Sequence, residues 1–226
     1  MNKQYAVFDW DNTVRKGFTL FDWIDYLVNR EAISSKIYDT ISSISKKYND
    51  KCITHDDYAK YACSEYSKAV RKHSFAELDT LAKEYLVCDM KQIFGGMGRL
   101  FNLLYQKDID IIVISGAPEI ILRHYKEKYH LSDIYAFKEC VVDGIITGQV
   151  AYNYGYNKEK AIDMLITKYG SGPLLAFGDS SSDVPLLNEA KYGFAVNNMI
   201  VGAETIYTPG NAISDMTIDM IAHIIQ

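Results

Sequence analysis

The chain has 226 residues, of which 48% are hydrophobic and 23% are charged, and its formal net charge is −5. This length and apolar content are sufficient for one large domain with a smaller insertion, and they argue against a disordered chain. The negative net charge and the lack of any block of Lys or Arg exclude nucleic acid and anionic membrane as the main partner.

Four cysteines are widely spaced along the chain, without a Cys-x-x-Cys pair: Cys52, Cys63, Cys88 and Cys140. Their spacing argues against a structural zinc site and a dense disulfide framework, so we expect reduced and mostly buried thiols. The first residues lead directly into an expected strand and leave no room for a signal peptide, and no apolar run approaches the roughly 18 residues of a membrane span. We therefore expect a cytoplasmic protein, either a monomer or a homodimer.

The first predicted element is a buried strand over residues 5–8, which ends at two carboxylates, Asp9 and Asp11. In an open parallel sheet, ligands bind just beyond the carboxyl ends of the strands. Two neighbouring carboxylates repel one another unless a cation, a shared proton or a basic group accompanies them. Magnesium, which prefers oxygen ligands, is the natural cation. An isolated Asp-x-Asp is also compatible with a solvated acidic loop, so the choice between a metal site and such a loop depends on the other segments of the chain.

A long helical segment follows the first strand. From Phe18 to about Cys88 the apolar residues recur at helical spacing. A stretch of about seventy residues is too long for an ordinary connection between two strands and fits an inserted subdomain. We expect a core of residues 1–14 and 92–226, and an all-helical cap of residues 15–91. Thr54–Asp57 and Ser74–Glu77 resemble capping boxes that begin the third and fourth helices.

Strands and helices alternate after residue 94, which predicts a parallel sheet covered on both faces. The predicted fold is therefore α/β, a doubly wound parallel sheet with an inserted all-helical cap subdomain. In chain order, the expected elements are a helix through Leu100, a strand over 109–114, a helix over 118–129, a hairpin of strands 135–142 and 145–150 around Asp143-Gly144, a helix over 158–169, a strand over 174–177, a helix over 183–190, a strand over 192–196 and a helix over 217–225.

Polar side chains follow three of these strands. Asp9 and Asp11 follow the first, Ser115 follows the second, and Asp179 precedes Asp183 after the strand over 174–177. In a doubly wound sheet all three strand ends lie at one edge, so these residues can converge on one cleft. Two acidic clusters and a hydroxyl are typical of a metal and phosphate site, although Ser115 could also simply begin the next helix.

The chain contains an internal control for this interpretation. Asp108 and Asp110 have the same spacing as Asp9 and Asp11, but they precede their strand. They should therefore lie at the opposite edge of the sheet as solvated charges. The position of the carboxylates relative to the strand, and not their spacing, indicates the site.

Four segments resemble, in order, the motifs of haloacid dehalogenase superfamily phosphatases: Asp9-Trp10-Asp11-Asn12-Thr13, Ser115-Gly116, Lys158 and Gly178-Asp179-Ser180-Ser181-Ser182-Asp183. The helical insertion resembles the type C1 cap, and the hairpin over 142–148 is similar to that of the phosphoserine phosphatase-like branch, subfamily IB. The resemblance implies a Rossmann-like core and a HAD-like phosphatase, that is, a phosphoric monoester hydrolase.

The resemblance also implies the roles of individual residues. Asp9 would be the nucleophile that forms an aspartyl-phosphate, and Asp11 the general acid and base. A magnesium site would use the Asp9 carboxylate, the Asp11 backbone carbonyl and Asp179, with Asp183 anchoring the water shell of the ion. Phosphate oxygens would be bound by the following residues: Thr13, Ser115, Gly116 and Lys158.

Two lysines compete for the last of these roles. Ala161, Ile162 and Leu165 follow at the spacing that turns one helix face to the core, which places Lys158 in the first turn facing the cleft. Lys160 is then a solvated helix charge.

Several residues depart from the pattern of the resembled branch. By position, Phe18 stands where phosphoserine phosphatases have a Glu that meets the substrate ammonium, which disfavours phosphoserine as substrate. Asn12 replaces a commoner Gly or Ser, and Ser182 stands where Asn is usual. Arg15 and Lys16 either meet a negative substrate or are solvated hinge charges, and we favour the second interpretation.

The helical insertion is rich in aromatic residues near its start: Phe18, Phe21, Trp23 and Tyr26. These rings could form a wall of the site, even one that binds a choline-like cation, although packing within the cap explains most of them.

The expected function is magnesium-dependent hydrolysis of a small phosphorylated metabolite. Two alternatives remain open: a phosphotransferase or phosphomutase that uses the same aspartyl-phosphate, and a catalytically weak phosphate-binding regulatory protein. Dehalogenation is disfavoured because it needs neither Asp11 nor the metal-binding acids.

Overall fold

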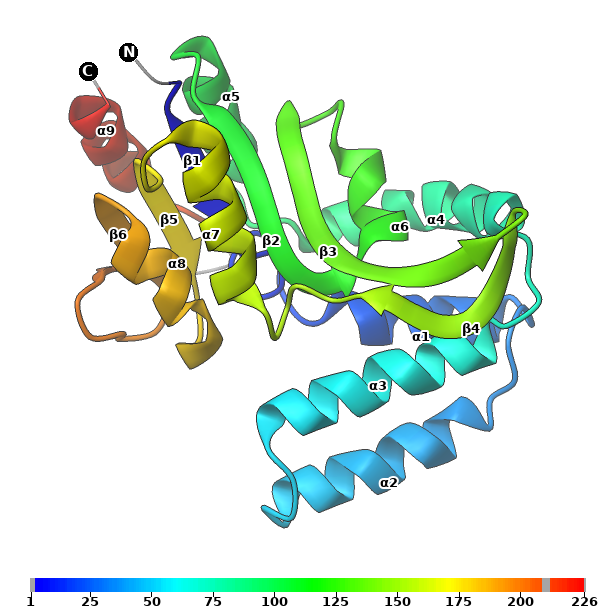
Figure 1. Cartoon of the computed structure of the whole chain (residues 1–226). Coiled ribbons are helices and arrows are strands. Elements are labelled where there is room, and N and C mark those ends of the chain that lie inside the picture. The colour runs from blue at the N-terminus through cyan, green and yellow to red at the C-terminus, as the bar shows by residue number, and fades with distance from the viewer. Residues whose placement is uncertain (1–2, 209–211, 226) are drawn as a thin grey trace.

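The computed structural model describes residues 3–208 and 212–225. In this part of the chain, seven strands form one sheet in the order β4-β3-β2-β1-β5-β6-β7 (Figure 1). Every neighbouring pair is parallel except the β3–β4 hairpin. The strands are β1 (Tyr5–Phe8), β2 (Asp110–Pro118), β3 (Leu131–Val142), β4 (Ile145–Tyr152), β5 (Leu175–Gly178), β6 (Tyr192–Val196) and β7 (Glu204–Ile206).

Five α-helices lie between β1 and β2 in the chain, and the first four, α1 to α4, form the expected helical insertion. The other helices connect or follow the strands of the sheet. None of the helices in the described ranges is long and apolar enough to cross a bilayer. The α-helices are α1 (Thr19–Asn29), α2 (Ile37–Asn49), α3 (His55–Ala69), α4 (Phe75–Asp89), α5 (Met97–Gln106), α6 (Glu119–Leu122), α7 (Lys158–Tyr169), α8 (Val184–Glu189) and α9 (Asp215–Ile224), with short 3-10 turns at Met90–Gln92, Arg123–Tyr125 and Ser181–Asp183.

The central strand β1 is buried on both faces. Because successive side chains of a strand point to opposite sides, Ala6 and Phe8 belong to the apolar cluster shared with α1, α4 and α5. Tyr5 and Val7 belong to a second cluster, which includes Leu165 of α7 and residues of α8. Helices on both faces explain why the first strand reads as a continuous apolar run, and they confirm the predicted doubly wound α/β fold.

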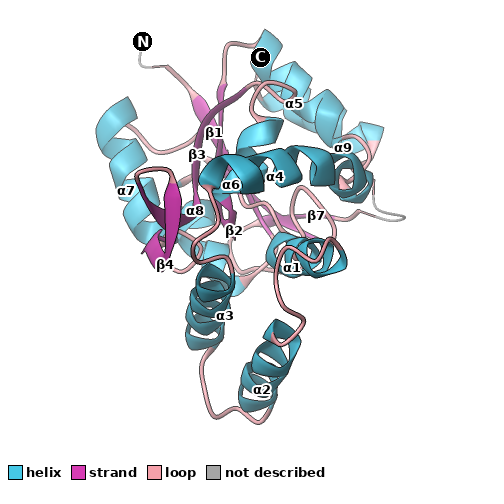
Figure 2. Ribbon diagram, turned by 90° about the vertical axis from the view of Figure 1, so that its right-hand side faces the viewer, coloured by secondary structure: helices cyan, strands magenta, loops and turns pink. Residues whose placement is uncertain are grey.

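The helical insertion is attached to the core in two ways. Its helices α1 and α4 pack into the same apolar cluster as β1, with Trp23 and Tyr85 buried there. The turn between α3 and α4 is hydrogen-bonded to β4, since the Lys72 amide donates to the Ile146 carbonyl at 2.9 Å and the Ile146 amide donates to the His73 carbonyl at 3.0 Å. Helices α2 and α3 extend away from the sheet (Figure 2). Helix α3 still contacts the core, since Tyr66 packs against Phe137 of β3 with ring centroids 5.9 Å apart, so α2 is the part of the insertion least attached to the core.

The two predicted capping boxes are present. The Thr54 hydroxyl accepts the Asp57 amide at the start of α3, and the Ser74 hydroxyl accepts the Glu77 amide at the start of α4. In both boxes the acidic side chain accepts the backbone amide of the capping residue in return. Each box satisfies amide groups that the first helical turn leaves without a partner.

Several elements differ from the sequence-based expectation. Strand β2 continues to Pro118 instead of ending at Ile114, and its pairing with β3 shifts register between these two residues. Strand β3 begins at Leu131 instead of residue 135.

The helix expected over 118–129 is α6, which ends at Leu122 and continues as a 3-10 turn. The chain must reverse there to enter β3 at Leu131, and His130 takes a left-handed conformation in the reversal. The short strand β7 was not expected, because only one of its three residues is buried and it therefore has no alternating pattern.

The cysteine prediction was partly wrong. The four thiols are free, but Cys63 alone is buried, whereas Cys52 and Cys88 are exposed and Cys140 is intermediate. Cys52 lies in the connection between α2 and α3, and Cys88 lies on α4. Reduced thiols do not need burial, so spacing alone could not place them.

A buried carboxyl group on β3 gives a testable prediction about pH. Burial raises the pKa of Glu139 from 4.5 to about 7, against the opposing hydrogen bonds from its own backbone and from Tyr66. The folded state therefore binds this proton more tightly than the unfolded state, and the resulting stability is fully present below pH 4.5 and is lost as the pH rises through 7. This difference corresponds to about 3 kcal/mol.

The variant Glu139→Gln should remove this pH dependence. We expect its free energy of unfolding to exceed that of wild type by up to about 3 kcal/mol at pH 8 and to differ little at pH 4.5. Urea unfolding at both pH values measures this, with Glu204→Gln at an exposed position of β7 as the control. A variant that loses stability equally at both pH values would contradict the assignment.

Candidate active site

Polar residues at the carboxyl ends of β1, β2 and β5 line one cavity of about 560 Å³. Parallel strands deliver their carboxyl ends to the same edge of the sheet, so segments far apart in the sequence meet there. The cavity is lined by these predicted site residues: Asp9, Asp11, Ser115, Gly116, Lys158 and Asp179.

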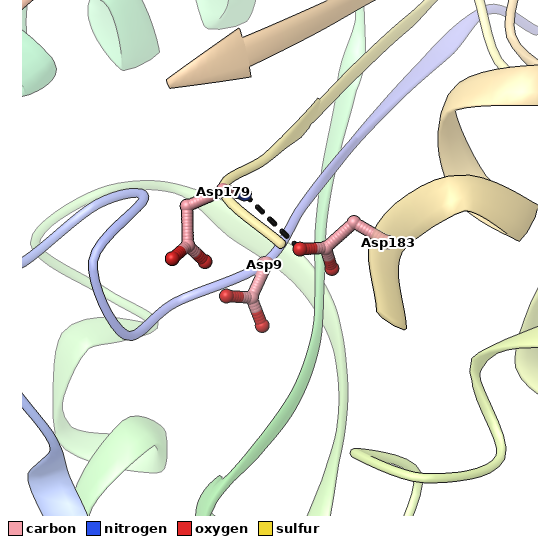
Figure 3. A group of neighbouring side chains, drawn as sticks. All are labelled: Asp9, Asp179 and Asp183. Carbon is pink, nitrogen blue, oxygen red and sulfur yellow. Dashed lines mark hydrogen bonds between the residues drawn. The ribbon is translucent and has the colours of Figure 1, made fainter. Parts of the chain in front are cut away.

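Three carboxyl groups gather at the base of this site (Figure 3). One oxygen of each of Asp9, Asp179 and Asp183 lies within 4.8 Å of the others. The Lys158 Nζ donates a hydrogen bond to Asp9 Oδ1 at 2.7 Å and also bonds to Asp183. An oxygen-only donor set of this kind suits a hard divalent cation, and this acidic cluster fits a metal site.

The loop after β5 is organised around Asp183. Its Oδ2 accepts hydrogen bonds from the amides of Asp179 and Ser180 and from the Ser180 hydroxyl, each at 3.0 Å. Because Lys158 occupies its other oxygen, the Asp183 carboxylate is fully engaged by the protein. A side chain at Gly178 would place its Cβ 2.3 Å from the Asp183 Cβ, so only glycine fits there. Asp183 therefore orients Lys158 and the backbone of Asp179.

Negative charge exceeds positive charge in this cluster. Burial raises the pKa of Asp9 to about 6, with Lys158 opposing the rise and Asp183 adding to it. Burial together with Asp9 and Asp183 raises the pKa of Asp179 to about 7. Burial alone would lower the pKa of Lys158, but Asp9 and Asp183 outweigh it and hold that pKa above its usual value. One ammonium cannot neutralise three carboxylates, so the site favours an additional cation.

Asp11 lies at the boundary between the core and α1. Its Oδ1 accepts the Thr19 hydroxyl at 2.5 Å and the Thr19 amide at 3.0 Å. Burial raises the pKa of Asp11 to about 7, although the Thr19 hydroxyl and Arg15 oppose the shift. A carboxyl group that retains its proton near neutral pH has the property that a general acid needs.

Two predicted phosphate-binding residues occupy different positions. Ser115 is buried, lines the cavity, and its hydroxyl accepts the Ala117 amide at 3.2 Å. Thr13 is also buried, but it is not among the residues that line the cavity, and its hydroxyl donates to Asp9 Oδ2 at 3.5 Å. Thr13 therefore contacts the predicted nucleophile and does not face the cavity.

Sequence reasoning missed the segment that closes the site beside Gly116. A Cβ at Gly155 would lie 2.7 Å from the Gly116 amide nitrogen, so the two backbones touch. The Asn153 Oδ1 accepts the Gly155 amide at 2.7 Å, and the Asn153 Nδ2 donates to the Cys63 sulfur at 3.2 Å. The turn-prone Asn-x-Gly sequence was a visible signal, but only the folded chain places it against Ser115-Gly116.

Arg15 is not a solvated hinge charge, so that interpretation was wrong. Its side chain is fully buried, and one guanidinium nitrogen lies 2.9 Å from Asp89 and 2.6 Å from Asp22. The other terminal nitrogen lies 3.9 Å from Asp11. Tyr125 also donates to Asp89, at 2.6 Å. A buried guanidinium requires carboxylate partners. Arg15 follows β1 and Asp89 ends α4, so their ion pair joins the two chain segments that connect the insertion to the core.

The variant Asp89→Asn should therefore be strongly destabilised. It leaves the Arg15 guanidinium buried without its buried carboxylate, and we expect a loss of about 3–5 kcal/mol in the free energy of unfolding. Asp22→Asn, which removes the half-exposed partner, should cost about 1 kcal/mol or less. Urea unfolding of both variants decides the point, and equal losses would contradict a special role for the buried pair.

The structure explains one departure from the resembled pattern, Asn12, and places the other residues relative to the cavity. Asn12 adopts a left-handed conformation with φ 59°, which Asn tolerates better than most residues, and its Oδ1 accepts the Gly17 amide at 2.9 Å. Phe18 precedes α1, is 53% exposed and lines the cavity. Ser182 also lines the cavity, whereas Lys160 is exposed on α7.

The sequence profile of the haloacid dehalogenase-like hydrolase family matches residues 6–188, which is most of the chain. The chain belongs to the haloacid dehalogenase-like hydrolases. No curated protein matches the sequence significantly. All residues that line the cavity fall within the matched range.

Solved structures support the fold of this haloacid dehalogenase-like hydrolase at low sequence identity. A protein with unknown function from Bordetella pertussis Tohama I has a TM-score of 0.75 at 16% identity, and the match covers 91% of this chain and 98% of that one. A phospho-aspartyl intermediate analogue of phosphoserine phosphatase has a TM-score of 0.64 at 17% identity, with 94% and 96% of the two chains covered. A substrate-bound phosphoserine phosphatase has a TM-score of 0.65 at 17% identity, with 94% and 95% covered.

Proposed function

We propose that this chain is a magnesium-dependent phosphomonoesterase that acts on a small phosphorylated metabolite through an aspartyl-phosphate at Asp9. The observation that carries the proposal is the meeting of Asp9, Asp11, Ser115 and Lys158 in one cavity with the acidic loop after β5. The cavity volume of about 560 Å³ suits a small molecule.

The residues divide the reaction into two displacements. Asp9 attacks phosphorus, and the bond from phosphorus to the leaving oxygen breaks while Asp11 gives that oxygen its proton. Asp11 then takes a proton from the water that attacks the aspartyl-phosphate, which releases inorganic phosphate and restores Asp9. The Ser115 hydroxyl, the Gly116 amide and Lys158 hold the phosphate oxygens during both steps.

Asp9, Asp179 and the Asp11 carbonyl would hold a magnesium ion, with Asp183 in a positioning role because its oxygens are already engaged. Bound there, the ion supplies positive charge that offsets the repulsion between the Asp9 carboxylate and the phosphate dianion. Thr13 contacts Asp9 and keeps its carboxylate oriented.

Hydrolysis of p-nitrophenyl phosphate by metal-stripped protein tests the proposal. We expect no turnover above the buffer blank in EDTA and recovery of turnover when magnesium is added in excess, because the site has a surplus of carboxylates without a metal. A rate that is the same in EDTA and in magnesium would contradict the metal requirement.

A further inference from the structure

The half of the cavity that faces the insertion is lined by aromatic side chains. Phe21 of α1 and Tyr58 of α3 have ring centroids 6.1 Å apart, and Tyr58 stacks on Tyr48 of α2 at 5.2 Å. Phe18 and Tyr156 complete this aromatic wall. A substrate with its phosphate beside Asp9, Ser115 and Lys158 would place its alcohol part toward this wall.

Positive charge is scarce in the same cavity. Among the described residues that line it, Lys158 is the one Lys or Arg, and Asp9 and Asp183 already hold its ammonium group. Arg15 is buried in ion pairs with Asp89 and Asp22 and does not line the cavity.

Two ionisable residues at the start of α3 line the cavity, His55 and Asp56, and the His55 Nδ1 lies 3.9 Å from the Asp56 carboxylate. Asp56 lies in the first turn of α3, is about half exposed and lines the cavity beside Tyr156. The Lys60 ammonium lies 5.0 Å from the centre of the Tyr156 ring, but Lys60 is not part of the lining. Asp56 is the carboxylate beside the His55 imidazole, so a negative group on the alcohol part of a substrate would meet Asp56 and would find no Lys or Arg partner.

We propose that this cavity takes phosphate monoesters whose alcohol has an apolar or aromatic body and carries no anionic group. The proposal rests on the proposed phosphomonoesterase function and defines its substrate class. A second phosphate or a carboxylate on the alcohol would lose its hydration without gaining a cationic partner, and it would be repelled by Asp56. An apolar ring gains by leaving water to contact the aromatic wall.

Three aryl phosphates of matched size test the proposal: 4-methylphenyl phosphate, 4-(aminomethyl)phenyl phosphate and 4-carboxyphenyl phosphate. We expect kcat/KM for the uncharged and the cationic esters to exceed that for the anionic ester by about tenfold or more. Equal values for the anionic and the uncharged ester would overturn the proposal. A lack of magnesium-dependent turnover of all three esters would instead overturn the proposed function.

Substitutions in the lining test whether charge causes this preference. Asn49 is the last residue of α2 and lines the cavity, and a basic residue suits a helix C-terminus. In Asn49→Arg we expect kcat/KM for the 4-carboxyphenyl ester to rise about tenfold relative to the 4-methylphenyl ester, and Asp56→Asn should shift the same ratio in the same direction by about threefold.

The matched control is Asn29→Arg, since Asn29 is the exposed last residue of α1 and does not line the cavity. This variant adds the same charge at the same position in a helix, so we expect the ratio to stay at its wild-type value. Lys60→Gln should also leave the ratio unchanged. An equal shift in Asn29→Arg and Asn49→Arg, or no shift in Asn49→Arg, would overturn the proposal.

Discussion

Replacing Asp9 by Asn is expected to lower kcat for p-nitrophenyl phosphate by more than about 10⁴-fold, because removal of a nucleophile disables the whole catalytic group. The Asn amide keeps the size of the side chain and one hydrogen-bond acceptor, but it cannot form the aspartyl-phosphate. Asp9 is buried and its carboxylate is paired with Lys158 at 2.7 Å. Steady-state kinetics at saturating magnesium, together with urea unfolding, separates lost chemistry from lost folding.

The control for this variant is Asp108→Asn, which makes the same chemical change at the opposite edge of the sheet. Asp108 precedes β2 and its side chain is 90% exposed. We expect kcat and the free energy of unfolding to stay within error of wild type. If Asp9→Asn retained more than about a tenth of the activity, Asp9 could not be the nucleophile.

Lys158→Met should cause a loss of stability as large as that expected for Asp89→Asn. Lys158 bridges the buried carboxylates of Asp9 and Asp183, and without it the two negative charges face one another inside the protein. Breaking a buried ion pair in this way costs about 3–5 kcal/mol. We also expect kcat to fall, because a phosphate oxygen loses its ammonium partner. Urea unfolding measures the first effect and p-nitrophenyl phosphate turnover the second.

Two further variants serve as controls for this prediction. Lys160→Met changes an exposed lysine two residues later in the same helix, and its free energy of unfolding should stay within about 0.5 kcal/mol of wild type. Lys158→Arg keeps the positive charge and should recover much of the stability but little of the activity, because a planar guanidinium does not reproduce the ammonium geometry. Comparable losses in Lys158→Met and Lys160→Met would contradict the assignment of Lys158.

Much of the fold was predictable because local patterns and tertiary structure agree. The buried run over residues 5–8, the two capping boxes and the Asp143-Gly144 turn each specify local structure through side chains nearby in sequence. The turn residues have φ values of 50° and 77°, which suit Asp and Gly. By contrast, β7 is held at the edge of the sheet by pairing with β6, and nothing in its own three residues indicates a strand.

The placement of the site residues followed from topology. Asp9 and Asp179 follow strands of one parallel sheet, and Ser115 lies in the carboxyl-terminal half of another, so their meeting in one cavity is a consequence of strand direction. The opposite location of Asp108 and Asp110 follows from the same rule. The expectation that both are solvated was wrong for Asp110, which lies 2.8 Å from the Lys3 ammonium and accepts the Tyr169 hydroxyl at 2.7 Å. The chemical roles of these residues stay predictions until activity is measured.

The parts that sequence reasoning missed depend on contacts between distant segments. Arg15 looks like any other charge near a turn, and its burial follows only from the approach of Asp89 at the end of α4. Gly155 looks like an ordinary loop glycine, and the sequence motif that contains Gly178 does not show why a glycine is needed there. Each is required because another group, Gly116 or Asp183, lies where a Cβ would be. Steric requirements of this kind have no signature in local sequence.

The stereochemical course at phosphorus tests the account most directly. A phosphorothioate monoester made chiral at phosphorus with two oxygen isotopes and hydrolysed in water that carries the third isotope gives chiral inorganic thiophosphate. The configuration of this product reports the number of in-line displacements. Attack by Asp9 followed by attack on the aspartyl-phosphate gives two inversions, so we expect net retention of configuration. Net inversion would mean that water attacks the substrate directly, and it would contradict the role of Asp9 as nucleophile.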